Sequence, residues 1–150
     1  HYYRVVLSLR ELNDVLLQFL DEAIINKSAS TSLAPINARF QLRGNFIEVV
    51  HDKIFEETPS ALLEIFVLVG YNENIQGIRA STIRLIRESR NFINDAYREN
   101  IQNKQLFLEL LKSPHNLVTQ LRRMKRYGIL GRYLPEFDLI IGQMQHDLFH

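Results

Sequence analysis

Two groups of arginines carry the clearest chemical signal in this sequence. One group lies at helical intervals in GIRASTIRLIRESR, and the other falls in QLRRMKR, where Lys125 raises the count to four positive charges in five positions. A guanidinium group makes forked hydrogen bonds to two oxygens of a phosphate or carboxylate, so each group could bind such a ligand. A solvated helix face with internal ion pairs is the alternative. The candidates are Arg79, Arg84, Arg87 and Arg90 for phosphates or an acidic cleft, and Arg122, Arg123 and Arg126 for docking a partner.

One carboxylate and one histidine–aspartate pair are further candidates for chemistry. Glu64 lies on an almost wholly apolar stretch, where burial would raise its pKa as in a general acid or base. Buried carboxylates are usually paired, so we expect Glu64 to pair with an arginine of a neighbouring helix or to face solvent. His146-Asp147 matches the dipeptide of a metal phosphohydrolase class, but the other histidines are scattered without metal-ligand spacing. We expect no metal site and no catalytic residue in this chain.

Composition excludes several classes of function. The sequence has no Gly-rich phosphate loop, no nucleophile motif and no Asp-x-Asp triplet. Its net charge of +1 is weak for DNA or RNA binding. Cysteine is absent, which excludes disulfides and fits the cytoplasm. No apolar run approaches the roughly 20 residues of a membrane span. We therefore expect one cytoplasmic domain of 150 residues that binds neither DNA nor a membrane.

Helices must position these candidates, and residues 58–90 are expected to organise the fold. Thr58-Pro59 supplies a capping hydroxyl and a proline at the first helical position, and a buried helix that ends at Gly70 should follow. Before it, residues 2–25 carry an apolar stripe at helical spacing, which predicts one buried face, with Asp14 on the polar side. The stripe consists of Val5, Leu9, Leu12, Leu16, Phe19, Leu20 and Ala23.

A β-hairpin is predicted at about residues 39–51. Gly44-Asn45 is a two-residue turn signal that suits a type II′ turn. This turn places four apolar side chains on one face of the hairpin and a mostly polar set on the other. Because a lone hairpin is marginal in water, its apolar face should lie against the helices. The expected pairs are Leu42–Ile47, Phe40–Val49, Arg43–Phe46 and Gln41–Glu48.

The remaining sequence predicts further helices. One should run over residues 78–97, with Glu88 partly neutralising Arg84, and a break is expected at 100–103. Residues 106–112 continue as helix, Ser113-Pro114 starts the next one, and a turn region at 131–137 precedes a last helix. The predicted fold is therefore mainly α, a multi-helix, bundle-like domain with one small β-hairpin.

Long strings of this sequence resemble the bifunctional PII uridylyltransferase and uridylyl-removing enzymes of bacterial nitrogen regulation. They are FQLRGNFIEVVH, TPSALLEIFVLVG, IRASTIRLIRESR, SPHNLVTQLRRMKRYGILGRYLPEF and IGQMQHDLFH, and they run through nearly the whole chain. The resemblance implies a nucleotidyltransferase module, a helical segment, an HD hydrolase module and two ACT modules, in that order. It implies that residues 1–143 are the helical connecting domain and residues 144–150 the start of the HD module.

The resemblance also implies an activity for the whole enzyme. Such enzymes move UMP from UTP onto a tyrosine of the PII protein with Mg²⁺, and remove it again under the control of glutamine. The transferase carboxylates and most HD ligands would lie outside residues 1–150, so this chain alone should be inactive and hold no cofactor. Its implied partners are the two neighbouring modules and PII. Its expected role is to support the transferase module and to position the HD module.

Other functions remain open at this point. The chain could be an interaction module that docks PII or a sister domain through the second arginine group. It could also be the helical domain of the related glutamine synthetase adenylyltransferase, although the strings RASTIRLIR and QMQHDLFH argue against that. A small RNA-binding helical domain has little support from the balanced charge.

Overall fold

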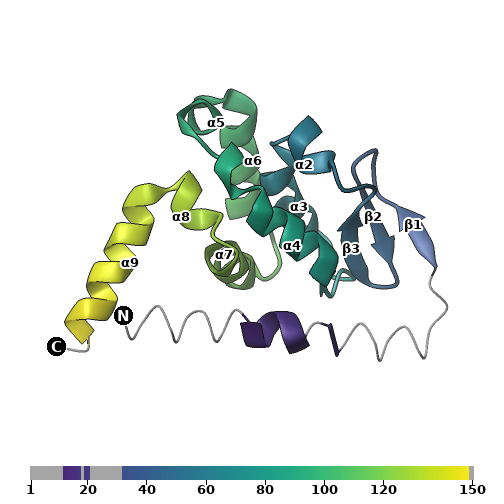
Figure 1. The fold of residues 1–150 in the computed structure, drawn as a ribbon, viewed down its shortest axis with the longest axis horizontal. Helices are drawn as coiled ribbons and strands as arrows, with labels where there is room; N and C mark the ends of the chain where they lie inside the picture. Colours follow the sequence, from purple (N-terminus) through teal and green to yellow (C-terminus); the bar gives the residue numbers. More distant parts are fainter. Residues whose placement is uncertain (1–11, 18, 21–31, 149–150) are drawn as a thin grey trace.

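Helices pack beside one small sheet in the computed structural model, which describes residues 12–17, 19–20 and 32–148 (Figure 1). This arrangement confirms a mainly α fold with a small β part. No helix in these ranges is long and apolar enough to cross a membrane. The elements in chain order are β1 (Leu33–Pro35), β2 (Phe40–Arg43), β3 (Phe46–Val49), α2 (Ile54–Glu57), α3 (Ala61–Gly70), β4 (Gly77–Ile78), α4 (Ala80–Glu88), the 3₁₀ helix η1 (Arg90–Phe92), α5 (Asp95–Glu99), α6 (Ile101–Leu111), α7 (Leu117–Arg126), α8 (Leu130–Tyr133) and α9 (Pro135–Leu148).

The predicted hairpin is confirmed in position and register. β2 and β3 pair antiparallel, with Phe40 opposite Val49 and Leu42 opposite Ile47. Gly44 has a φ of 61°, the positive value that the predicted turn requires at this position. The sheet is larger than predicted, because β1 pairs antiparallel with β2 and β4 pairs parallel with β3. These outer strands have three and two residues, too few to show an alternating pattern in the sequence.

The apolar face of the sheet and the helix α3 form the core. Phe40 and Ile47 on the sheet are fully buried, as predicted for that face. Seven of the ten residues of α3 are buried, and the helix contacts α2, α6 and α7. It ends at Gly70 as predicted. Because burial of apolar surface is the main favourable term in folding, α3 is the element on which the other helices depend.

Asparagine caps explain why helices after α4 begin at other residues than predicted. The expected helix over 78–97 is divided into α4, η1 and α5, since the side-chain oxygen of Asn94 accepts a hydrogen bond from the amide of Tyr97 at 2.9 Å. Asn100 caps α6 in the same way by accepting from the amide of Asn103 at 3.2 Å. The expected break at 100–103 is therefore present at Asn100, and α6 begins earlier than the predicted residue 106.

The last helices also begin at other residues than predicted. α7 starts at Leu117 and not at Ser113-Pro114, because Asn116 has a left-handed φ of 57° and interrupts the helical backbone before it. The predicted turn region at 131–137 is instead formed by α8 and the first turn of α9. The expected domain boundary between residues 143 and 144 falls inside α9.

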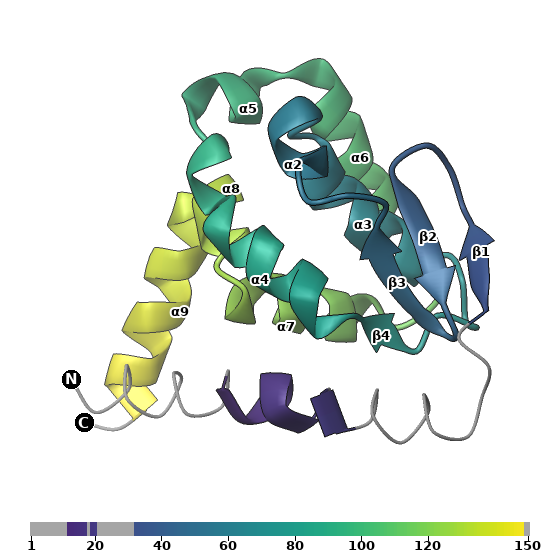
Figure 2. The same cartoon turned by 45° about the vertical axis from the view of Figure 1, so that its right-hand side comes forward.

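An N-terminal segment, the helical residues 12–17 and 19–20, lies along α4 and α7 (Figure 2). The rest of the predicted helix over 2–25 lies outside the described residues. The predicted buried face is wrong here, because its described members are between 51% and 59% exposed. The segment packs instead through Val15 and through Asp14, which pairs with Arg126 of α7 and so turns the apolar stripe towards solvent. The exposed members are Leu12, Leu16, Phe19 and Leu20.

Candidate functional site

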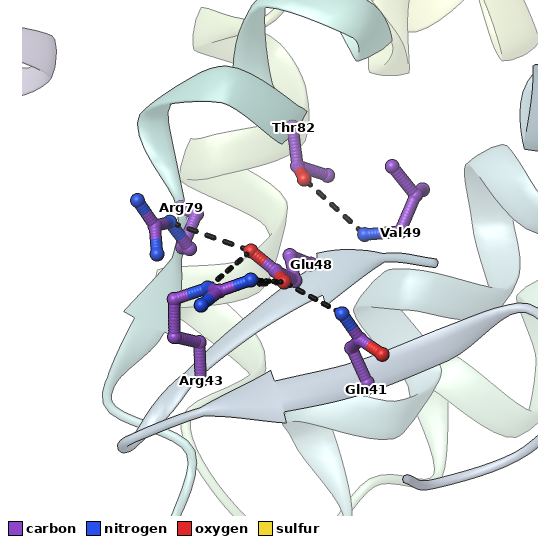
Figure 3. A network of polar contacts seen from close by, with 6 residues as sticks. All are labelled: Gln41, Arg43, Glu48, Val49, Arg79 and Thr82. Carbon is purple, nitrogen blue, oxygen red and sulfur yellow. Dashed lines mark hydrogen bonds and ion pairs between the residues drawn. The ribbon is translucent and has the colours of Figure 1, made fainter. Parts of the chain in front are cut away.

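Arg79 belongs to a network of polar contacts on the face of the sheet that carries Gln41 and Glu48 (Figure 3). It directly follows β4, and its Nε lies 3.5 Å from Oε1 of Glu48 on β3. Arg43 reaches the same carboxylate from β2 at 3.0 Å, and Gln41 donates a hydrogen bond of 2.7 Å to it. Burial acts to raise the pKa of Glu48, but the hydrogen bonds from Arg43 and Gln41 and the charges of both arginines outweigh it and lower the pKa. Arg79 therefore has a structural partner inside the fold.

The other arginines of the first group have different surroundings. Arg84 is exposed, and its Nε lies 3.9 Å from Glu88, which confirms the predicted pairing. The guanidinium carbon of Arg87 lies 5.5 Å from the ring centre of Tyr127 in a cation–π contact. Arg90 donates from Nε to the carbonyl oxygen of Arg87 at 2.9 Å. Arg84 and Arg90 are thus exposed to solvent, whereas Arg87 is half-buried.

In the second arginine group, one member is exposed to solvent and the other two line a cavity. Arg122 is exposed on α7, whereas Arg123 and Arg126 line a cavity of about 200 Å³. Arg126 pairs with Asp14 of the N-terminal segment at the edge of this cavity. Arg123 donates a long hydrogen bond of 3.5 Å from Nη2 to the carbonyl oxygen of Gln76. The full lining is Asp14, Leu17, Phe46, Gln76, Gly77, Arg123, Arg126 and Tyr127.

Tyr127 is the residue at which the two arginine groups meet. Arg87 of α4 lies over its ring, and the charges of Arg123, Arg126 and Arg87 all act on its hydroxyl. Burial raises the pKa of Tyr127 in spite of these charges. Burial likewise lowers the pKa of the Arg123 guanidinium. Sequence reasoning treated the two groups as separate, and their spacing along the chain gives no signal of this convergence.

Glu64 is paired, as expected, but its partners come from the loop before β2 and not from a helix. Arg39 binds both carboxylate oxygens, with Nε 2.6 Å from Oε1 and Nη2 2.7 Å from Oε2. Asn37 donates a further hydrogen bond of 3.1 Å to Oε2. The hydrogen bond to Glu64 raises the pKa of Arg39. This forked ion pair fastens the loop to α3, so Glu64 has a structural role in this fold.

His146 and Asp147 lie near the end of α9 and are both exposed. Across the described ranges, no three His, Asp or Glu side chains gather closely enough to hold a metal ion. A metal phosphohydrolase site needs such a group of ligands from separate elements. The dipeptide is therefore not part of a metal centre formed by the described residues.

The fold and these sites define a class of protein, a mainly α domain with arginine-rich surfaces whose described residues contain no complete set of metal ligands. The chain belongs to the family described as the third domain of the uridylyltransferase GlnD, whose family model matches residues 40–133. This assignment agrees with the resemblance to the uridylyltransferases and not with the adenylyltransferase alternative.

Curated relatives support the same family. The chain is 56% identical over 149 residues to a bifunctional uridylyltransferase/uridylyl-removing enzyme of Pseudomonas aeruginosa (strain LESB58). It is 53% identical to the enzyme of the same name in Pseudomonas putida (strain KT2440 among its designations) and 52% identical to that of Ectopseudomonas mendocina (strain ymp). In each case the match covers 99% of this chain but 17% of the relative's length. No solved structure matches the chain.

Proposed function

We propose that this chain serves as the helical connecting domain of a cytoplasmic PII uridylyltransferase and uridylyl-removing enzyme. The whole enzyme would transfer UMP from UTP to a tyrosine of PII with Mg²⁺ and remove it again, in nitrogen regulation. The carrying observation is the family match together with relatives that are about six times longer and named for both activities. In this proposal the domain supports the nucleotidyltransferase module and positions the HD module.

The exposed apolar stripe of the N-terminal segment supports contact with a neighbouring module. Leu12, Leu16 and Leu20 follow one another at helical spacing and are all more than half exposed. Contiguous apolar surface of this kind usually marks a contact with another protein surface. The stripe is therefore the surface that we assign to the transferase module.

Association of separately produced modules tests this role. The chain should bind the nucleotidyltransferase module of the same enzyme in an isothermal titration, and Leu16→Glu should weaken that binding at least about tenfold. Leu108→Glu, at an exposed leucine on α6, is the matched control and should leave the affinity unchanged. Equal effects of the two substitutions, or no association at all, would contradict the proposal.

Contact with UTP is a second part of the proposal. Arg84 is exposed beside Glu88 and Arg87 lies near the surface, so the first arginine group could meet the UTP phosphates or the acidic cleft of the transferase module. In the full enzyme, Arg84→Glu should slow transfer of UMP to PII while its removal continues at the wild-type rate. Unchanged transfer would exclude a role for Arg84 at the nucleotide.

The chain on its own is expected to be inactive. The described residues contain no metal-binding group, and both reactions of the proposed enzyme are expected to need metal ions. Purified chain mixed with PII, UTP and Mg²⁺ should therefore leave PII unmodified, and uridylylated PII should keep its UMP. Turnover in either assay would overturn this expectation.

Docking of PII is the alternative function of the second arginine group. Arg122 favours it, because this residue is exposed on α7 and is free to meet an acidic partner surface. Arg123 and Arg126 could contribute only at the mouth of their cavity. Arg122→Glu should weaken PII binding without changing UTP affinity if this alternative holds, and an unchanged PII affinity would reject it.

A further inference from the structure

Arg123 is a cation whose surroundings do not balance its charge. Its side chain is half-buried, and burial lowers its pKa because the charged form has lost part of its hydration. Within the described residues its one hydrogen bond is the long contact to the Gln76 carbonyl oxygen, and the carboxylate that acts on its charge, Asp14, forms its ion pair with Arg126. Desolvated charges in proteins are usually paired, since an unpaired one costs free energy. A partner for Arg123 is therefore expected in the cavity that it lines.

The cavity beside Arg123 carries excess positive charge. Arg126, one helical turn further along α7, lines it too, and its pairing with Asp14 satisfies one of the two guanidinium groups. The C-terminal end of α7 adds only about half an elementary negative charge. The cavity is thus suited to one small anion that Arg123 and Arg126 would share.

The dimensions of the cavity select a small ligand. Its volume of about 200 Å³ corresponds to about seven water molecules at ~30 Å³ each, which suits a small anion and not a helix or strand of a partner protein. Gly77 is part of the lining and has no side chain to fill the space. Two forked guanidinium groups match the oxygens of a phosphate group.

We infer that this cavity between α7, β4 and the N-terminal segment is a binding site for the phosphate group of a small metabolite, held by Arg123 and Arg126. The carboxylate of Asp14 would compete with this phosphate group, because it pairs with Arg126. The inference goes beyond the proposed function and needs neither the neighbouring modules nor PII. It is therefore tested on this chain alone.

Isothermal titration with orthophosphate at low ionic strength is the first experiment, because salt screens such contacts. The chain should bind orthophosphate with a dissociation constant in the millimolar range or below, and Arg123→Gln should weaken binding about tenfold, as expected for loss of a charge-assisted hydrogen bond. Arg122→Gln removes the same charge from the next, exposed position and should change the affinity less than twofold. Diphosphate and UTP, titrated in parallel, identify the source of the phosphate group, since tighter UTP binding would indicate a nucleotide.

Asp14→Asn gives the opposite expectation from the arginine substitution. Removal of the competing carboxylate should tighten orthophosphate binding several-fold, because Arg126 then becomes available to the ligand. Thermal unfolding of each variant without ligand checks that the fold is kept, and Arg123→Lys, which retains the charge, replaces Arg123→Gln if the latter unfolds. No heat of binding up to about 10 mM orthophosphate, or equal losses of affinity for Arg122→Gln and Arg123→Gln, would overturn the inference.

Discussion

Arginine side chains form ion pairs with the carboxylates that become buried or half-buried on folding. Glu48 and Glu64 are each held by a forked or double arginine contact, one within the sheet and one between a loop and α3. A buried carboxylate that loses such partners is strongly unfavourable. The sequence predicted that Glu64 would be paired, but it could not predict Arg39 as the partner, because the loop that carries it has no periodic pattern.

Loss of the Glu48 charge should destabilise the protein in a pH-dependent way. Glu48→Gln is expected to lower the free energy of unfolding at pH 7 by about 1 to 2 kcal/mol, the scale of charge-assisted hydrogen bonds. The pKa of Glu48 is lower in the folded state than its ordinary value of 4.5, so its contribution is present above that pH. The difference between wild type and variant should therefore shrink as pH falls below 4.5 through the folded pKa. Urea unfolding at a series of pH values measures this.

The control for this prediction is an exposed ion pair. Glu56 lies 3.6 Å from Lys53 on the surface, and Glu56→Gln should change the free energy of unfolding by less than about 0.5 kcal/mol. The difference in the free energy of unfolding between wild type and Glu48→Gln could also stay constant from pH 7 down to about pH 3. That result would show that the charge of Glu48 is not its cause.

The hydroxyl of Thr82 continues the hydrogen bonding of the sheet where β4 ends. The buried amide of Val49 on β3 donates to Oγ1 of Thr82 on α4 at 3.3 Å (Figure 3). Thr82→Val keeps the shape of the side chain but removes the hydrogen-bond acceptor, which should lower the free energy of unfolding by about 1 to 3 kcal/mol. Thr82→Ser keeps the hydroxyl and should cost less. If chemical denaturation shows that Thr82→Val and Thr82→Ser lower the free energy of unfolding equally, the hydrogen bond is not what stabilises the protein at this position.

At the scale of elements, local signals predicted those parts of the fold that are self-contained. The hairpin register followed from its turn and its alternation, and the end of α3 followed from Gly70. Asn100 coincides with the predicted break at 100–103, whereas the cap at Asn94 was not predicted, because the apolar pattern continues across it. The rotation of the N-terminal segment could not be predicted, since it depends on contacts with distant parts of the chain, among them the packing of Val15 and the pairing of Asp14 with Arg126.

Gly128 ends α7 in a conformation that other residues rarely adopt. Its φ is 81°, and a Cβ there would come within 2.6 Å of the Arg90 side chain. Gly128→Ala should therefore lower the free energy of unfolding by about 1 to 2 kcal/mol, most of it from the backbone. Gly131→Ala, within α8, is the comparison and should be neutral or stabilising, since alanine favours helix. In an Arg90→Ala background the cost of Gly128→Ala should fall only slightly, because the backbone strain remains.

At the scale of the whole molecule, the buried core lies within the range of residues that the family model matches. Every buried apolar side chain among the described residues lies between Phe40 and Tyr133, and the family model matches residues 40–133. The N-terminal segment and α9 flank this unit with exposed leucines. The described residues of these flanks thus add no fully buried apolar side chain, although Val15 packs against the core.

A chain of residues 32–134 should therefore fold by itself. It keeps the sheet and every apolar residue that is buried among the described ones, and it loses the packing of Val15 and the pairing of Asp14 with Arg126, so its Tm should fall by no more than about 5 °C. Circular dichroism should show one cooperative transition. A broad transition, or binding of a dye for exposed apolar surface, would show that the flanks are needed for a fixed core.

The parallel pairing of β3 with β4 has a consequence for the order of folding. β2 and β3 close through a two-residue turn, a local event on the scale of about 1–10 μs, whereas β4 can reach β3 only after the chain has passed through α2 and α3. Closing a longer loop costs more entropy before any contact repays it. The hairpin can thus form early, while the fourth strand is added late, and the speed at which this sheet is completed depends on the docking of α3.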